Sequence, residues 1–473
     1  MLGSSPERRM IYVGAAIALC TTVAAVALAA PTLQSVAVTP AARSLSVGGT
    51  QRYTATGTFS DGSTQALEAA GDNVALGFQT TCVLLTTGGV DCWGKNDKGQ
   101  LGDGNTVDSL IPRPVKWITN AKAVASEWEH GCAVVGQGAV RCWGNNNFGQ
   151  LGNGTTTNSA LPVRVIGISS ATAVAVGWGH SCALLASGAI RCWGVNTRGE
   201  LGHGTDASWS SAPVNVVGIH SATALAVGWK HSCALLANGA VQCWGHAQSG
   251  QLGDGTTTTF SGVPVAVRGI NNATGVATGA YFSCALLATG AVQCWGYGDS
   301  GELGSGTFAD SSVPVPVTGI SAAVALTAGG FHACAVLGSG STQCWGSNSY
   351  GELGAGSLTT SSSNIPVPVS EISAPVKVVA GLFHTCALLS DGAMRCWGYN
   401  SDGQLGDRRK TGETRNPRPV NVIGTPGVVW ESSDPTKAAI SMRGRATASA
   451  PGNTTITATT AGFVNDNAVL TVK

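Results

Sequence analysis

The chain alternates short runs of apolar residues with clusters of glycine, asparagine, aspartate and proline over most of its length. Short runs bounded by turn-forming residues predict β-strands joined by tight turns. Glycine provides 66 of the 473 residues, about twice the usual share of roughly 7%. This much glycine favours turns and disfavours helices, so the sequence predicts an all-β protein.

The strand pattern repeats seven times between residues 71 and 424, with a period of 50 to 52 residues. One unit reads ATAVAVGWGHSCALLASGAIRCWGVNTRGELGHGT, and a linker ending in PVNVVGI follows it. Each unit contains Cys-Trp-Gly and then Gly-Gln/Glu-Leu-Gly. The tryptophans of the seven units are Trp93, Trp143, Trp193, Trp244, Trp295, Trp345 and Trp397. Repeats of this size, each a small antiparallel sheet, are typical of propeller blades. Residues 71–424 are therefore predicted to form a seven-bladed β-propeller.

Fourteen of the 15 cysteines form seven pairs, and the members of each pair are ten residues apart. The pairs are Cys82 and Cys92, Cys132 and Cys142, Cys182 and Cys192, Cys233 and Cys243, Cys284 and Cys294, Cys334 and Cys344, and Cys386 and Cys396. A glycine such as Gly188 follows each first cysteine by six residues, which fits a hairpin whose three-residue loop ends in a left-handed residue. In that register the two cysteines lie directly opposite each other, so we predict one disulfide in each blade. Zinc binding is the alternative, but zinc sites usually pair cysteines about two to four residues apart.

These repeats resemble the regulator of chromosome condensation repeat family, in its bacterial secreted form. The motifs that carry the resemblance are G-x-x-H-x-C-A-L-L, C-W-G-x-N and G-Q-L-G, which recur in all seven units with small departures. The resemblance implies a seven-bladed propeller over about residues 71–424. It implies no single function, because the members of this family have unrelated functions. Nucleotide exchange on a small nuclear GTPase, one of those functions, is not expected of an exported chain.

The two ends of the chain have a different pattern. Residues 33–65 and 428–473 alternate apolar and polar residues between turns, which predicts antiparallel strands. They resemble the two halves of a group 2 bacterial Ig-like domain, through motifs such as Val36-x-Val38-x-Pro40 and Gly452-x-Thr454-Thr455-Ile456. Neither half alone has enough strands to bury a core. We therefore predict that the propeller is inserted into one Ig-like β-sandwich, with residues 31–70 as its first half and 425–473 as its second. Two separate incomplete domains are the alternative.

Residues 1–30 have the pattern of an export segment. Arg8 and Arg9 precede an apolar run from Met10 to Ala30 that ends in small residues, as in a secretory signal. We expect cleavage after Ala29. The run is also long enough to remain as a single uncleaved membrane anchor. In either case the folded part is expected to be secreted or at the cell surface, where disulfides persist.

Charge and motifs exclude several classes of function. The 26 lysines and arginines nearly balance the 25 aspartates and glutamates, which argues against a nucleic-acid-binding surface. The sequence has no recognisable Ser-His-Asp or Cys-His pattern, and the cysteines are committed to pairs. We therefore expect no enzymatic activity, no catalytic residues and no cofactor.

Five of the eight histidines occupy one position of the repeat, two residues before the first cysteine of a blade. They are His130, His180, His231, His332 and His384. Thr80 and Phe282 take this place in the other two blades, and such an interrupted ring is a poor metal site. We expect no metal site and predict instead that each histidine bonds the backbone of a neighbouring blade.

Every blade has an aromatic residue just before this position. We predict that six of them form a binding surface, namely Trp128, Trp178, Trp229, Tyr281, Phe331 and Phe383. Equivalent positions of a repeat lie on one ring, so these side chains are expected to share one face near the central channel. We expect the three tryptophans to be exposed, and Phe78 and the last three aromatics to belong to the core. The alternative is that all of them cap the core between blades.

Together these patterns predict a non-catalytic, exported binding module. Aromatic side chains on one face suit recognition of a protein, here an extracellular or envelope protein. A carbohydrate-binding module is the second hypothesis, and Glu129 beside Trp128 is the acid that would contact the sugar. The third hypothesis is a rigid structural spacer. Contact with a membrane is expected only through the N-terminal segment.

Overall fold

The structure is a computed structural model that describes most of the chain beyond the predicted export segment. The described residues are 33–59, 64–66, 70–85, 87–205, 207–358, 360–389, 393–409, 415–422, 428–440, 445–460 and 463–473. Residues 1–30 lie outside these ranges. Every regular element in the described ranges is a β-strand. Accordingly, no helix in this part of the chain could span a membrane.

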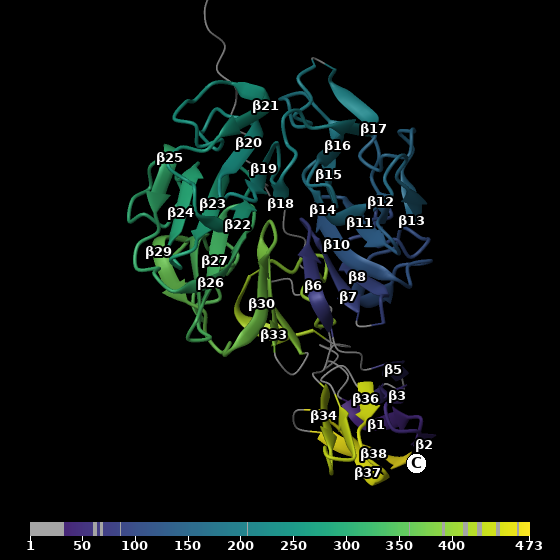
Figure 1. The fold of residues 1–473 in the computed structure, drawn as a ribbon. Coiled ribbons are helices and arrows are strands. Elements are labelled where there is room, and N and C mark those ends of the chain that lie inside the picture. Colours follow the sequence, from purple (N-terminus) through teal and green to yellow (C-terminus); the bar gives the residue numbers. More distant parts are fainter. Residues whose placement is uncertain are drawn as a thin grey trace, which may run out of the picture.

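Seven four-stranded antiparallel sheets follow one another along the chain, and each uses four consecutive strands (Figure 1). Blade 1 contains β6 (Ala70–Leu76), β7 (Thr80–Leu85), β8 (Val90–Gly94) and β9 (Ser109–Pro114). Blade 2 contains β10 (Ala121–Glu127), β11 (His130–Val135), β12 (Ala139–Gly144) and β13 (Ser159–Arg164). Blade 3 contains β14 (Ala171–Val176), β15 (His180–Leu185), β16 (Ile190–Val195) and β17 (Trp209–Asn215).

The other four blades have the same order of strands. Blade 4 contains β18 (Ala222–Val227), β19 (His231–Leu236), β20 (Val241–His246) and β21 (Phe260–Ala266). Blade 5 contains β22 (Ala273–Thr278), β23 (Phe282–Leu287), β24 (Val292–Gly296) and β25 (Ser311–Pro316). Blade 6 contains β26 (Ala323–Ala328), β27 (His332–Leu337), β28 (Thr342–Ser347) and β29 (Ser362–Pro368). Blade 7 contains β30 (Pro375–Ala380), β31 (His384–Leu389), β32 (Met394–Gly398) and β33 (Asn416–Asn421).

The seven blades close into a ring. The first strand of each blade packs against the first strand of the next blade, and β30 of blade 7 packs against β6 of blade 1. The apolar core is divided into seven clusters, each shared by two adjacent blades. Each cluster combines the disulfide of one blade with the tryptophan of the next, as Cys82, Cys92 and Trp143 do. The prediction of a seven-bladed propeller is confirmed.

All seven predicted disulfides are present, one in each blade. They join Cys82 to Cys92, Cys132 to Cys142, Cys182 to Cys192, Cys233 to Cys243, Cys284 to Cys294, Cys334 to Cys344, and Cys386 to Cys396. In every blade the two cysteines are direct partners across the second and third strands. The disulfides are therefore local to their hairpins, and none of them links one blade to another.

The hairpin of blade 3 shows why the spacing is ten residues. Cys182 pairs directly with Cys192 across β15 and β16. The loop has the predicted length, because Leu185 N donates to Ala189 O at 2.9 Å and Gly188 has a φ of 79°. Glycine adopts this left-handed conformation without the steric cost of a Cβ. The ten-residue spacing therefore follows from the register of the hairpin.

The two ends of the chain form one sandwich. Its first segment provides β1 (Leu33–Thr39), β2 (Ala42–Leu45), β3 (Thr50–Arg52), β4 (Thr54–Phe59) and β5 (Thr64–Ala66). Its second segment provides β34 (Val428–Ser432), β35 (Ala438–Ile440), β36 (Arg445–Ala448), β37 (Gly452–Thr460) and β38 (Phe463–Val472). Strand β2 pairs with β38 in parallel, and β3 pairs with β36 antiparallel.

Both segments also contribute to one core. Val36, Val38 and Tyr53 of the first segment are buried together with Ile456 and Leu470 of the second. The segments thus share sheets and a core, so they are one Ig-like domain and not two incomplete ones. The chain leaves this sandwich after β5, builds the propeller and returns at β34 (Figure 1).

This arrangement predicts that the sandwich folds without the propeller. Replacing residues 67–427 by a flexible Gly/Ser linker retains all ten sandwich strands and the whole of their shared core. We expect this short chain to unfold cooperatively in urea, monitored by far-UV circular dichroism. Residues 428–473 alone are the control and should be unfolded, because they lack the partners of β36 and β38. An unstructured product at every one of several linker lengths would contradict the single-domain arrangement.

Candidate functional site

The predicted aromatic residues lie at one end of the propeller. Trp128, Trp178 and Trp229 occupy the turns between the first and second strands of blades 2, 3 and 4. Tyr281, Phe331 and Phe383 do the same in blades 5, 6 and 7, and Phe78 does so in blade 1. The longer loops between the third and fourth strands of the blades lie at this end too, because the chain reverses direction at each strand. We call this end the aromatic face.

Five of these rings form a closed circle of contacts. The centroids of Phe78 and Trp128 are 4.7 Å apart, and the rings stack at an interplanar angle of 11°. The circle continues from Trp128 to Trp229 at 5.5 Å and from there to Phe331 at 5.6 Å. Phe383 completes it, at 6.1 Å from Phe331 and 5.6 Å from Phe78. Since blades 1, 2, 4, 6 and 7 contribute these rings, side chains from around the whole ring meet.

The other two predicted residues extend this circle outward. Trp178 contacts Trp128 with centroids 6.5 Å apart, and Tyr281 contacts Trp229 at 5.5 Å. Further aromatics from the long loops pack around them, and none of these was predicted to take part. They are Phe148, Tyr297, Tyr350 and Tyr399. Phe148 and Tyr350 directly precede Gly-Gln/Glu-Leu-Gly, and Tyr297 and Tyr399 directly follow Cys-Trp-Gly. The exposure of these four side chains could not be judged from the repeat alone.

The aromatic side chains differ from the prediction in exposure. Trp128, Trp178 and Trp229 are half-buried, and so are Phe78 and the three aromatics of blades 5 to 7. The expected contrast between exposed tryptophans and core phenylalanines is therefore wrong. The physical reason is that each ring contacts rings from other blades, which cover part of its surface. The role of the six residues in binding stays a prediction.

Charged and polar groups border the rings. Lys230 Nζ lies 5.4 Å from the centroid of the Trp178 ring, a cation–π contact between blades 4 and 3. Glu129, beside Trp128, accepts a hydrogen bond from Asn145 Nδ2 at 2.7 Å. Trp128 itself has a φ of 49°, a left-handed conformation that is uncommon for a bulky residue. Strain of this kind persists where the surrounding structure fixes it, and the stacked Phe78 ring is part of that structure.

Beneath the aromatic face, the same hydrogen bond joins every pair of adjacent blades. The indole N–H of each Cys-Trp-Gly tryptophan donates to the carbonyl of the Gln or Glu of Gly-Gln/Glu-Leu-Gly in the preceding blade. Trp143 bonds Gln100 O at 2.9 Å in this way. Trp93 bonds Gln404 O at 2.9 Å across the boundary between blades 7 and 1. All seven indoles are fully buried, and each of them makes this hydrogen bond.

The five histidines of the repeat also join adjacent blades, but not through the backbone as predicted. Each Nε2 lies within hydrogen-bond distance of a serine or threonine hydroxyl of the next blade. The pairs are His130–Ser181, His180–Ser232, His231–Ser283, His332–Thr385 and His384–Thr81. His384 Nε2 lies 2.9 Å from Thr81 Oγ1, and Thr81 Oγ1 in turn donates to Gln404 O. A side-chain hydroxyl suits this position because it can accept and donate at once.

Where a blade lacks this histidine, the next blade lacks the partner hydroxyl as well. Phe282 of blade 5 is followed in blade 6 by Ala333, and both are fully buried. Thr80 of blade 1 is followed in blade 2 by Gly131, and its hydroxyl lies 3.2 Å from that of Ser126. A buried polar group without a partner is costly. Each boundary therefore has either both members of this polar pair or neither of them.

Burial sets the protonation state of these groups. It lowers the pKa of the imidazoles of His130, His180, His231, His332 and His384 from 6.5 to about 3. They are therefore neutral at ordinary pH. Burial also raises the pKa of the Glu302 and Glu352 carboxyls from 4.5 to about 7. Among the described residues, no group of three or more His, Cys, Asp or Glu side chains could hold a metal ion.

The RCC1-like domain family matches residues 165–439. The chain belongs to this family. Its regulator of chromosome condensation (RCC1) repeats match residues 87–134 and 137–184, with a second form of the repeat at 72–100 and 121–150. A bacterial Ig-like domain of group 2 matches residues 422–472, which is the second half of the sandwich.

Three solved structures similar to this RCC1-like chain are human and yeast proteins. Human WBSCR16 superposes with a TM-score of 0.62 at 24% identity, over 68% of this chain and 88% of that one. Yeast RCC1 (Prp20) bound to Kap60 gives 0.60 at 19% identity, over 77% and 88%. Prp20p from Saccharomyces cerevisiae, described with its binding to Gsp1p and histones, gives 0.60 at 18% identity, over 77% and 90%. At these identities the likeness shows the fold alone.

The buried histidines predict a loss of stability in acid. The unfolded chain takes up a proton on each imidazole as the pH falls through 6.5, whereas the folded chain does not until about pH 3. The double variant His332→Phe/Thr385→Ala copies the natural pair of Phe282 and Ala333 and removes one such group. Between about pH 7.5 and about pH 4.5 it should gain about 2–3 kcal/mol in unfolding free energy relative to wild type.

Urea unfolding at both pH values measures this difference. Thr385→Ser is the matched control, because serine already partners three of the histidines, and its pH dependence should equal that of wild type. The same acid sensitivity in the double variant and in wild type would contradict the assignment of a neutral, buried His332.

The buried glutamates predict the opposite pH dependence. Glu302 Oε2 accepts a hydrogen bond from Ser300 N at 2.8 Å, and Gln251 Oε1 accepts the equivalent bond from Ser249 N in blade 4. A raised pKa means that the folded state holds the proton more tightly, so this stability is lost as the pH rises through about 7. From about pH 5 to about pH 8, Glu302→Gln should gain about 2–3 kcal/mol over wild type. Thermal melting at the two pH values tests this, and an equal effect at both would contradict it.

Proposed function

We propose that the protein is a non-catalytic, exported binding module, and that its aromatic face recognises an extracellular or envelope protein. The observation that carries this proposal is the closed circle of Phe78, Trp128, Trp229, Phe331 and Phe383. Half-buried aromatic rings that already hold one another in place lose little conformational entropy on binding. Such residues dominate the binding energy at many protein interfaces.

The surroundings of the circle favour a protein over a sugar as its ligand. A sugar site places an acid or amide free to bond hydroxyls beside an aromatic ring. Here one carboxylate oxygen of Glu129, the acid beside Trp128, already accepts a hydrogen bond from Asn145. Lys230 lies over Trp178, which adds a cation to the aromatic surface. Aromatic rings mixed with cationic groups at the centre of a face are typical of protein-binding hot spots.

Two further observations support a binding role outside the cytoplasm. The seven disulfides need an oxidising compartment to form and persist. Yeast RCC1, which shares the propeller fold, was solved bound to a protein, Kap60. A protein with this fold thus occurs in a protein complex. We infer a protein-binding role for this chain too, with an extracellular or envelope protein as the partner.

Capture of a partner tests this proposal. The full chain is immobilised and exposed to envelope and culture-fluid fractions of the source organism, and retained proteins are identified by mass spectrometry. Wild type is compared with Trp178→Ala/Trp229→Ala. The matched control is Trp117→Ala, since Trp117 is 65% exposed and lies at the opposite end of β10 from Trp128. We expect one protein to be retained by wild type and by the control but not by the double variant.

Stability has to be measured alongside, because the two mutated rings are half-buried. Loss of their contacts should cost about 2 kcal/mol each, so the double variant should melt earlier but remain folded with all seven disulfides. Equal retention by all three proteins would place the binding surface elsewhere. No retention by any of them would favour the structural spacer over a binding module.

A further inference from the structure

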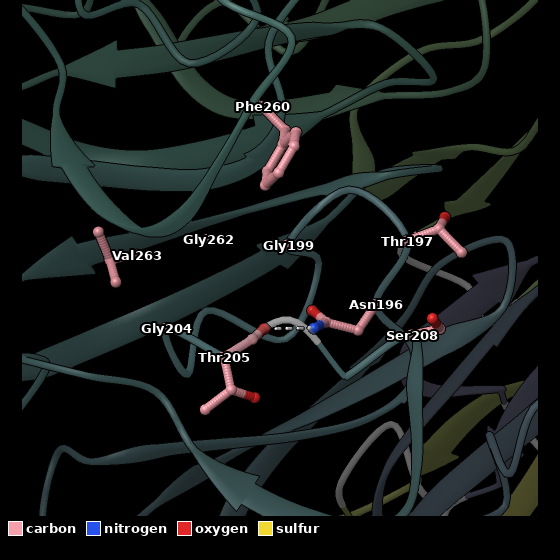
Figure 2. A pocket seen from close by; sticks show the side chains of 9 residues that line it. All are labelled: Asn196, Thr197, Gly199, Gly204, Thr205, Ser208, Phe260, Gly262 and Val263. Atoms are coloured by element: carbon pink, nitrogen blue, oxygen red, sulfur yellow. Dashed lines mark hydrogen bonds between the residues drawn. The ribbon is translucent and has the colours of Figure 1, made fainter.

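A pocket opens at the outer rim of the propeller, away from the circle of aromatic rings. It has a volume of about 440 Å³ and lies between the long loop of blade 3 and the outer strand β21 of blade 4. Figure 2 shows Phe260 and Val263 on one side of it and Asn196, Thr205 and Ser208 on the other. Pockets that hold small molecules usually have volumes of about 300–1,000 Å³.

One glycine opens this pocket. In each blade, the first glycine of Gly-Gln/Glu-Leu-Gly approaches one residue of the next blade's outer strand. For Gly199 this residue is Gly262, so close that a methyl group on Gly199 would lie 2.6 Å from the Cα of Gly262. The other six boundaries have a side chain here, from Leu110, Ala160, Ser211, Ser312, Asn364 and Pro417. A Cβ added to Gly262 would meet no heavy atom within 4 Å, so there is open space beside this position.

The lining of the pocket has both apolar and hydrogen-bonding parts. Phe260 is 46% exposed, and its ring borders the opening. Thr197, Thr205 and Ser208 contribute hydroxyl groups on the other side. Asn196 is held in place, because its Nδ2 donates to the carbonyls of Thr205 and Ala207. None of the described lining residues carries a charge.

We propose that this pocket binds a neutral sugar ring. A pyranose has an apolar face of C–H groups that packs on an aromatic ring and a rim of hydroxyls that exchange hydrogen bonds with side chains. Phe260 and the hydroxyl residues stand on opposite sides of the pocket and match these two parts. A charged ligand is disfavoured because no described lining residue would compensate its charge. This site lies between a long loop and an outer strand, apart from the circle of aromatic rings, and does not depend on that circle.

Saturation-transfer difference NMR and titration calorimetry with the full chain test this proposal. The probes are cellobiose, maltose and N,N′-diacetylchitobiose, which are neutral and differ in linkage and in the acetamido group. We expect at least one of them to bind wild type. Gly262→Leu, which introduces the residue found at this position in blade 1, should fill the pocket and weaken that binding at least about tenfold. Phe260→Ala should weaken it by a similar factor.

Two control variants separate this site from others. Ser312→Leu makes the corresponding change at the next boundary, between blades 4 and 5, and should bind the probe as wild type does. Trp178→Ala/Trp229→Ala, which alters the aromatic face, should also leave sugar binding unchanged. Gly262→Ser is a milder variant, because serine is the natural residue at two boundaries, and it keeps the test valid should the leucine variant fail to fold.

The outcomes are distinct from those of the partner-capture experiment. Binding that is lost on filling the pocket and kept in both controls supports the rim site. Binding that survives Gly262→Leu in a folded protein would overturn it. So would loss of binding in the aromatic-face variant, which would assign the sugar to that face. The absence of binding by all three probes to wild type would also overturn it.

Discussion

The fold depends on one main-chain carbonyl in each blade, that of the Gln or Glu in Gly-Gln/Glu-Leu-Gly. This oxygen accepts the indole N–H of the next blade's tryptophan at all seven boundaries. At four of them it also accepts a hydroxyl, from Thr81, Ser181, Ser283 or Thr385. A carbonyl has two lone pairs, so both donors fit. The bond can form only when the two blades are at the correct distance and angle, and it therefore sets the geometry of the ring.

Around this carbonyl, the apolar core is assembled from small pieces. Each boundary buries the disulfide of one blade beneath the tryptophan of the next, and all fourteen cysteines are at most 1% exposed. A hairpin of this size closes a short loop, so each disulfide contributes only about 2–3 kcal/mol through chain entropy. The position of each disulfide in the core also adds to stability, because the sulfur atoms fill space between two sheets. With only 11% charged residues, the protein relies on this packing more than on ion pairs.

The fold could be predicted from the sequence because each motif that constrains the structure occurs seven times. The spacing of the cysteines revealed the register of the hairpins, and the motifs of both ends revealed the split sandwich. Contacts between repeats were harder to predict. The partner of His332 is Thr385, 53 residues later, and only a structure shows that these two positions meet. Exposure of the aromatic rings was misjudged for the same reason, since rings from different blades cover one another. Gly262 is one glycine among 66, and only its neighbour across the boundary shows what its missing side chain leaves open.

The split sandwich has a consequence for how the ring stays closed. Each blade is made from one continuous stretch of chain, so no strand from one end of the propeller completes a blade at the other. The boundary between blades 7 and 1 is held by side-chain packing and by bonds such as that of Trp93 to Gln404. The sandwich pairs β2 with β38 and β3 with β36, and so ties together the two chain ends that flank this boundary. The sandwich therefore keeps blades 7 and 1 close together. When their boundary opens, the two blades remain at a high effective concentration, and the boundary re-forms as an intramolecular step.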